Sequence, residues 1–257
     1  MDAVAPAWLP DYRPIYHYRS VTRNGGALDV TPSLGQITPG MLFRVRDGGW
    51  NALDDKEGAP DYYKQRSVTV LTADGGMIEA MTYCVIPEKQ TAFIKPNPSY
   101  AQLVDDGLMD WELPTQAHTQ AAHNEFPSFA VRHVFAYGRL QAEYDLGRSV
   151  KGIEHRQAAR TRGRLFDLGS YPAWQPTVEP DAWVQGELLT LSQPAATLKQ
   201  IDTIERFIGY GEDSLYHRVL VTAVVTETGE NVLAWCYRYA QKISEQPLIA
   251  DGRWSAS

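Results

Sequence analysis

The clearest pattern in the sequence is two pairs of alternating apolar and polar runs, each pair divided by a turn that contains glycine. One turn holds Asp74-Gly75 and the other holds Thr228-Gly229. Side chains of a strand point alternately to its two faces, so such runs are typical of half-buried strands, and two runs joined by a glycine turn predict a hairpin. The flanking runs are residues 67–71, 80–84, 219–225 and 234–237.

Three segments carry helix signals. Residues 53–57 and 198–205 predict short helices, and the second region repeats isoleucine at intervals of three or four residues. Asn97-Pro98-Ser99 precedes an apolar stretch and predicts the start of a third helix, with Ser99 as its N-cap. Strands and helices do not alternate as in a doubly wound sheet, so the chain is predicted to be an α+β protein of short strands in a barrel-like arrangement.

The same order of features occurs twice, which indicates a duplicated domain. In each half, a glycine, an Asp-x-x-Glu segment, an alternating strand and a tyrosine-containing strand follow one another. The separation of matching positions grows slowly along the chain, as small loop insertions would produce. The pairs Gly40/Gly186, Glu57/Glu205 and Tyr83/Tyr237 are 146, 148 and 154 residues apart.

This repeat divides the chain into two units and a tail. Unit 1 is predicted over residues 1–124 and unit 2 over residues 125–245, each of a usual domain size. Residues 114–130 are rich in Ala, His, Gln and Pro and are interpreted as the connector. Residues 246–257 are interpreted as a tail.

Composition and charge exclude several classes of protein. The 257 residues include 24 Lys and Arg against 31 Asp and Glu, a net charge of −7. A nucleic-acid partner is not expected, because such proteins normally carry a clustered basic excess. No apolar stretch approaches the roughly 20 residues of a membrane-spanning helix, and the chain starts without a signal-peptide pattern, so a cytoplasmic protein is expected. Two cysteines, and histidines without ligand spacing, predict no metal site.

Glu57 and Glu205 are the first candidates for chemistry, because they occupy matching positions in the two units. Each ends a short predicted helix with an aspartate three residues earlier. A glutamate at a helix end is ordinarily solvated or paired with a basic residue. Among apolar neighbours its pKa instead rises toward neutrality, and such a carboxyl group can accept and return protons. The repetition favours this second interpretation more than a single glutamate would.

A second candidate is the segment from Val134 to Leu140, an apolar strand that ends in Tyr137-Gly138. A glycine at a strand end lets the backbone approach a ligand, and successive N–H groups of a turn can hold a carboxylate. Arg139 adds a guanidinium that suits an anion. The alternative is an ordinary strand-to-loop turn. The basic stretch from Arg148 to Arg164 is likewise either a solvated face or the lining of an anion pocket.

These motifs, in this order, resemble those of γ-glutamylcyclotransferase-like proteins, which include γ-glutamylamine cyclotransferases and plant AIG2-like proteins. Unit 2 resembles the family from Tyr137 through Glu205 to Tyr237. Unit 1 resembles the γ-glutamylcyclotransferase branch at Arg23–Gly26, Gly40, Leu53–Gly58, Tyr83 and Pro98–Tyr100. Together the two matches cover most of the chain.

The resemblance implies a fold of two tandem small mixed β-barrel units with flanking helices. It also implies an enzyme that releases 5-oxoproline and a free amine or amino acid from a small γ-glutamyl substrate. The substrate's own α-amine attacks the γ-carbonyl, so no cofactor is needed. Glu205 and Glu57 match the family's proton-shuttling glutamate and are the catalytic candidates. The implied substrate-binding residues are Tyr137, Gly138, Arg139, Leu140 and Tyr100.

Both units depart from the family pattern. Unit 1 lacks the Tyr-Gly loop, so unit 2 is expected to carry the activity. In unit 2, Arg139 stands where Ser or Thr is usual, and Arg206 follows Glu205 where Gly is common. An Arg206 guanidinium that reached Glu205 would lower the pKa of that carboxyl and impair a proton shuttle. Two alternatives therefore stay open: a non-catalytic protein that binds a small acid or a partner, and an enzyme that cleaves an amide to a free acid.

Overall fold

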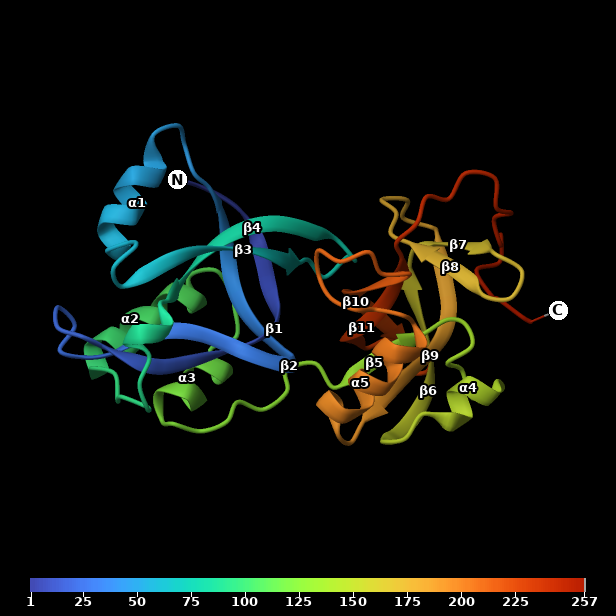
Figure 1. Cartoon of the computed structure of the whole chain (residues 1–257). Helices are drawn as coiled ribbons and strands as arrows, with labels where there is room; N and C mark the ends of the chain where they lie inside the picture. The colour runs from blue at the N-terminus through green and yellow to red at the C-terminus, as the bar shows by residue number, and fades with distance from the viewer. Residues whose placement is uncertain (257) are drawn as a thin grey trace. The chain divides into compact units, whose positions relative to one another are not determined.

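The computed structural model describes residues 1–256 and divides them into two compact units (Figure 1). Unit 1 comprises residues 1–70 and 78–130, and unit 2 comprises residues 71–77 and 131–256. Each unit contains a sheet of its own, in keeping with the repeat in the sequence. The change from one unit to the other near residue 130 lies a few residues beyond the boundary drawn from the sequence.

Two long strands dominate the sheet of unit 1. β1 (Asp2–Ser20) and β2 (Gly25–Arg44) pair antiparallel and span 19 and 20 residues, with three irregularities in their register. β3 (Tyr63–Leu71) and β4 (Met77–Val85) form the hairpin predicted around Asp74-Gly75, and the strand order is β2-β1-β3-β4. Only short strands are predicted from the sequence here, because prolines interrupt the alternation of apolar and polar residues along β1 and β2. The register shifts accommodate this irregularity.

Helical segments complete unit 1. They are α1 (Gly49–Glu57), the 3-10 turn η1 (Pro87–Lys89), α2 (Pro98–Met109) and α3 (Gln116–Ala122). The N-cap of α2 is Asn97, not the predicted Ser99: the Asn97 carboxamide oxygen accepts a hydrogen bond from the Ser99 backbone N–H at 3.0 Å. The cap therefore lies two residues earlier, because proline at the first helical position leaves the cap to the residue before it.

α3 lies inside the segment that the sequence analysis interprets as a connector. Its His118 is buried, with Nε2 2.5 Å from the Tyr16 hydroxyl of β1 and Nδ1 2.7 Å from the Asp105 carboxylate of α2. Ala121 and Ala122 of α3 pack in the same small core as Tyr16. A seven-residue helix without an apolar stripe has no sequence pattern to mark it, and these tertiary contacts stabilise it.

Unit 2 is built on a closed barrel of strand order β10-β11-β5-β9-β6. The strands are β5 (His133–Ala136), β6 (Ile153–Arg162), β9 (Trp183–Leu191), β10 (Tyr216–Val225) and β11 (Asn231–Tyr239). β10 and β11 form the hairpin predicted around Thr228-Gly229. β5 lies between β9, with which it pairs antiparallel, and β11, with which it pairs parallel. The loop that follows β5 therefore begins between two strands of the barrel.

Shorter elements surround this barrel. They are α4 (Asp145–Ser149), the hairpin of β7 (Arg164–Asp167) with β8 (Pro172–Gln175), and α5 (Pro194–Ile204). The segment interpreted as a tail packs here as well: the Ile249 N–H donates to the Leu165 carbonyl at 2.8 Å, and Trp254 is only 3% exposed within the core of unit 2.

The α+β class is confirmed, and unit 2 has the closed barrel that the sequence analysis expects. The strands of unit 1 form a four-stranded sheet. Among residues 1–256, no helix has both the length and the apolar character needed to cross a bilayer. Over the same residues, no three His, Cys, Asp or Glu side chains gather in a way that could hold a metal ion.

Candidate active site

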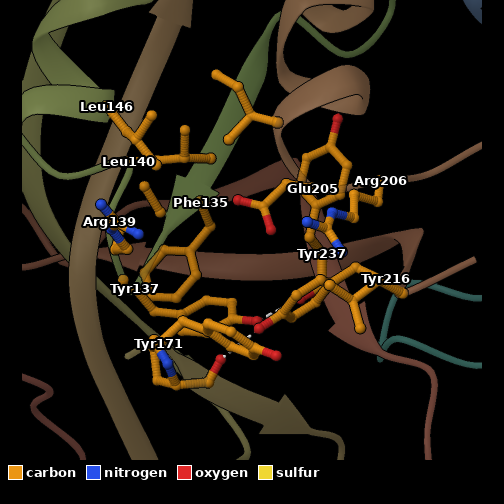
Figure 2. Close-up of a pocket in the computed structure, with 15 residues that line it drawn as sticks. Phe135, Tyr137, Arg139, Leu140, Leu146, Tyr171, Glu205, Arg206, Tyr216 and Tyr237 are labelled. Carbon is orange, nitrogen blue, oxygen red and sulfur yellow. Dashed lines mark hydrogen bonds between the residues drawn. The ribbon is translucent and has the colours of Figure 1, made fainter. Parts of the chain in front are cut away.

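A pocket of about 260 Å³ lies in unit 2, where the loop after β5, the end of α5 and the start of β10 meet (Figure 2). Drug-sized ligands occupy cavities of roughly 300–1,000 Å³, so this pocket suits a small metabolite. Its polar lining residues are Tyr137, Arg139, Tyr171, Glu205, Arg206, Tyr216 and Tyr237. Apolar lining residues include Phe135, Leu140, Leu146 and Leu215.

The loop after β5 forms one wall of this pocket. Gly138 lies so close to Pro172 that a Cβ atom built on it would be 2.8 Å from the proline ring, so a side chain here would displace the β8 strand. The backbone N–H groups of Gly138, Arg139 and Leu140 form no hydrogen bond to another residue within 1–256. Three successive donors without an internal partner are suited to an anion such as a carboxylate.

Arg156 of β6 holds this loop in place. Its guanidinium donates to the carbonyls of Leu140 and Gly147 at 3.1 and 2.7 Å, and it forms an ion pair with Glu187 of β9 at 2.9 Å. The Glu187 carboxylate also accepts the Ala142 N–H at 2.9 Å. This member of the basic stretch therefore holds the loop in place and is not part of the pocket lining.

Glu205 reaches the pocket from the C-terminal end of α5. The helix buries Leu198 and Ile201 against the unit, and the Glu205 N–H closes its last turn by donating to the Ile201 carbonyl at 2.9 Å. Arg206 then leaves the helix in the left-handed conformation, with φ of 52°. This change of direction places Glu205 and Arg206 together in the pocket lining.

The Glu205 carboxyl is held in a state suited to proton transfer. Burial raises its pKa to about 7, and the negative charge of Asp202 adds to the rise. Arg206 does not offset this effect: among the described residues the two side chains form no ion pair. The concern raised by the sequence, that Arg206 lowers the pKa of Glu205, does not arise in this structure. A carboxyl group with a pKa near neutrality can act as a base and then as an acid at physiological pH.

Asp202 is fixed one helical turn before Glu205. Its carboxylate accepts a hydrogen bond from the Tyr237 hydroxyl at 2.6 Å and forms an ion pair with Arg218 at 2.7 Å. The Arg218 side chain is fully buried, with its guanidinium 5.1 and 4.9 Å from the ring centroids of Phe207 and Trp235. A buried guanidinium is thus paired with the Asp202 carboxylate, and the charge of Asp202 disfavours a second negative charge on Glu205.

Tyr137, Tyr216 and Tyr237 complete the lining, and their hydroxyls are already engaged. Tyr137 donates to the Tyr237 carbonyl at 2.5 Å, and Tyr216 donates to the Pro172 carbonyl at 2.7 Å. Burial raises the pKa of all three phenols, Tyr237 included, so they remain neutral and do not compete with Glu205 for protons. Their rings instead supply a dry wall that strengthens electrostatic interactions in the pocket.

The raised pKa of Glu205 has a consequence for stability. The folded state favours the protonated carboxyl, so this contribution to stability is present below the unfolded-state pKa and is lost as the pH rises through about 7. Glutamine mimics the protonated form at every pH. The difference in unfolding free energy between Glu205→Gln and the wild type should therefore shift in favour of the variant as the pH rises. We expect this shift to be about 2–3 kcal/mol between pH 5 and pH 8, as measured by urea denaturation. If the difference in unfolding free energy between the two proteins is the same at pH 5 and at pH 8, the raised pKa of Glu205 is contradicted.

Unit 1 repeats part of this arrangement. Asp54, three residues before Glu57 on α1, accepts hydrogen bonds from the Tyr83 hydroxyl at 2.7 Å and the Gln65 amide at 2.8 Å. Glu57 is half-buried at the end of α1, as Glu205 is at the end of α5. Both units therefore contain a hydrogen bond between an aspartate and a strand tyrosine. The fully buried Arg218 lies beside Asp202, in unit 2.

Tyr100 belongs to unit 1 and does not line the pocket of unit 2. It lies on α2, where its hydroxyl accepts the Leu28 N–H at 3.3 Å and the Arg23 guanidinium covers its ring at 3.9 Å. The structure thus brings together Glu205 and the Tyr137–Leu140 loop, and it places Glu57 and Tyr100 elsewhere.

Sequence reasoning missed Asp202, Arg218, Tyr216 and the loop support from Arg156. One signal was available for the first: an aspartate precedes the glutamate by three residues in both units, and a tyrosine recurs in the last strand of both. Arg218 is marked only as the last residue of a Tyr-x-Arg motif, Tyr216-His217-Arg218, which gives it no role. Arg156 carries no comparable signal, because its partner Glu187 is distant in the sequence.

Comparison with known proteins follows the same division of the chain. The model of a family described as "Gamma-glutamyl cyclotransferase, AIG2-like" matches residues 1–102 and 134–256. A search of curated proteins found no match.

Solved structures with a similar fold include a protein titled "Gamma-glutamyl cyclotransferase", which is 21% identical with a TM-score of 0.43 over 49% of this chain and 76% of its own. An uncharacterized protein from Homo sapiens is 22% identical with the same TM-score of 0.43, over 49% of this chain and 76% of its own. YkqA from Bacillus subtilis covers 95% of this chain and 77% of its own at 14% identity and a TM-score of 0.36.

Proposed function

The chain belongs to the AIG2-like γ-glutamyl cyclotransferase family, and on that premise we propose that unit 2 converts a γ-glutamyl compound into 5-oxoproline and a free amine or amino acid. The observation that carries the proposal is the pairing, in one pocket, of a carboxyl group with a pKa of about 7 and a loop with three open N–H donors. The reaction needs one group that moves protons and one that holds the substrate's α-carboxylate.

The proposed reaction forms one carbon–nitrogen bond and breaks another, and Glu205 moves the protons that both changes require. The ionised Glu205 takes a proton from the substrate's α-ammonium group, and the freed amine attacks the γ-carbonyl carbon to form the five-membered ring. Glu205 returns its proton to the leaving nitrogen as the bond between that carbon and the leaving nitrogen breaks. The Glu205 carboxylate then takes the second proton of the ring nitrogen, which leaves the neutral lactam N–H, and passes it to the released amine, which departs as an ammonium ion. The attacking and attacked atoms belong to one molecule, so holding the substrate in a folded pose lowers the barrier without an enzyme nucleophile.

The loop after β5 is the proposed site for the α-carboxylate. With this group held by the N–H donors of residues 138–140, the α-ammonium beside it would face Glu205 across the pocket (Figure 2). Unit 1 has a glutamate at the matching position and lacks the loop, so we propose that it is not active. The proposal retains the expectation of a cytoplasmic enzyme that uses no cofactor.

Release of 5-oxoproline is the direct test. Purified full-length protein is incubated with γ-glutamyl-alanine, γ-glutamyl-ethylamine and γ-glutamyl-ε-lysine, and 5-oxoproline is measured by mass spectrometry. Turnover of at least one substrate supports the proposal. Saturable binding of these compounds without turnover would instead favour the non-catalytic alternative.

The pH dependence of the reaction follows from the pKa of Glu205. The base form is the ionised carboxylate, so kcat/KM rises with pH through about 7 and reaches a plateau above it. At pH 6 we expect about one tenth of the plateau value, because only about a tenth of the carboxyl is then ionised. A limb near pH 4–5, the range of an ordinary glutamate, would contradict the assignment of Glu205 as the base. Circular dichroism over the same range serves as the control for unfolding.

A further inference from the structure

Two arginines line the pocket without a carboxylate partner. Arg139 lies in the loop after β5 and Arg206 directly after Glu205, and both side chains are exposed. Figure 2 shows them on opposite sides of the Glu205 carboxylate. Within residues 1–256 neither forms an ion pair or a side-chain hydrogen bond, whereas Arg156 and Arg218 are paired with Glu187 and Asp202. The two guanidiniums are therefore available to a ligand.

Arg206 also occupies a backbone conformation that disfavours it. Its φ of 52° lies in the left-handed region, where the Cβ atom of an L-residue is crowded and glycine is not. The turn does not depend on the side chain, because the Arg206 carbonyl accepts the Leu215 N–H at 3.2 Å through the backbone alone. Backbone strain at a pocket residue is a sign that the side chain is retained for what it binds.

We propose that Arg206 binds a carboxylate on the leaving amine, so that the substrates are γ-glutamyl α-amino acids and not γ-glutamyl alkylamines. This inference rests on the proposed cyclotransferase reaction. A γ-glutamyl α-amino acid carries one ammonium and two carboxylates. The pocket offers one carboxylate, Glu205, and two guanidiniums on either side of it, which is the complementary set of charges.

The two guanidiniums act on different parts of this substrate. Arg139 belongs to the loop that receives the α-carboxylate, which every γ-glutamyl compound has. Arg206 lies on the other side of Glu205 (Figure 2). With the α-carboxylate in the loop and the α-amine at Glu205, the leaving group would extend toward Arg206. Arg206 therefore discriminates between leaving groups, and Arg139 does not.

The test compares two substrates that differ only in that carboxylate, γ-glutamyl-alanine and γ-glutamyl-ethylamine. For the wild type we expect kcat/KM to favour γ-glutamyl-alanine by about tenfold or more, the usual range for a hydrogen bond between charged groups. Arg206→Gly should bring this ratio close to one, mainly through loss of the γ-glutamyl-alanine reaction. Arg206→Lys should retain part of the preference, because the positive charge remains.

Three controls separate binding from folding. The midpoint of thermal unfolding for Arg206→Gly should equal or exceed that of the wild type, since glycine relieves the strained φ. Arg139→Ser should raise KM for both substrates and leave their ratio in place. Arg253→Ser, which removes an exposed charge outside the pocket lining, should leave the ratio as in the wild type.

The outcomes distinguish this inference from the proposed function. If the wild type converts both substrates equally well, or if Arg206→Gly slows both by the same factor, the role of Arg206 is overturned while the cyclotransferase function stands. If the wild type converts neither these substrates nor any other γ-glutamyl compound, the proposed function fails and this inference fails with it.

Discussion

Replacement of Glu205 by Gln is expected to slow 5-oxoproline release by about a thousandfold, within the usual range for loss of a general acid–base group. Glutamine has the same shape as the protonated glutamic acid that burial favours, so the fold should be preserved and stability at pH 8 increased. The measurement is kcat with saturating γ-glutamyl-alanine for wild type and Glu205→Gln, with circular dichroism of both proteins.

Unit 1 supplies a matched control for this variant. Glu57→Gln makes the same change at the corresponding helix end, next to an aspartate that also contacts a strand tyrosine. Its kcat should equal that of the wild type. Loss of turnover in Glu57→Gln, with full turnover in Glu205→Gln, would move the reaction to unit 1 and show that another segment replaces the missing loop.

Replacement of Arg218 by Met is expected to destabilise unit 2 by about 3–5 kcal/mol, the cost of breaking a buried ion pair by removing one partner. The Arg218 side chain is fully buried and its guanidinium contacts the Asp202 carboxylate at 2.7 Å. Methionine keeps an unbranched apolar side chain at this position but removes the guanidinium, which leaves the negative charge of Asp202 poorly compensated. Urea denaturation gives the change in unfolding free energy.

Two further variants define this effect. Arg148→Met breaks an exposed ion pair with Asp145 and should cost less than about 1 kcal/mol. The double variant Arg218→Met with Asp202→Asn removes both charges and should recover part of the stability lost in the single variant. A loss for Arg218→Met no larger than that for Arg148→Met would contradict a structural role for the buried pair.

The parts of this protein that could be predicted from sequence are those set by local patterns. The hairpins around Asp74-Gly75 and Thr228-Gly229 follow from strand alternation and turn residues close together in the chain. The Tyr137-Gly138 loop follows from an apolar strand that ends in glycine. Repetition marked Glu205, because the same residue type recurs at the end of a helix in each unit.

The parts that could not be predicted depend on contacts between distant residues. α3 has no apolar periodicity and is held by His118, whose partners on β1 and α2 are 102 and 13 residues away. The pKa of Glu205 depends on burial by a barrel that the sequence does not position. The role of the C-terminal residues was also missed, because a lone Trp254 among polar residues carries no pattern and is buried only in the folded unit.

The most direct test of the account is to identify the product formed from γ-glutamyl-alanine in water enriched in ¹⁸O. The account predicts 5-oxoproline and alanine in equal amounts, with no ¹⁸O in the 5-oxoproline, because the substrate's own amine, not water, attacks the γ-carbonyl. Free glutamate carrying ¹⁸O would show that water is the nucleophile and that the amide is hydrolysed, which would contradict the central claim.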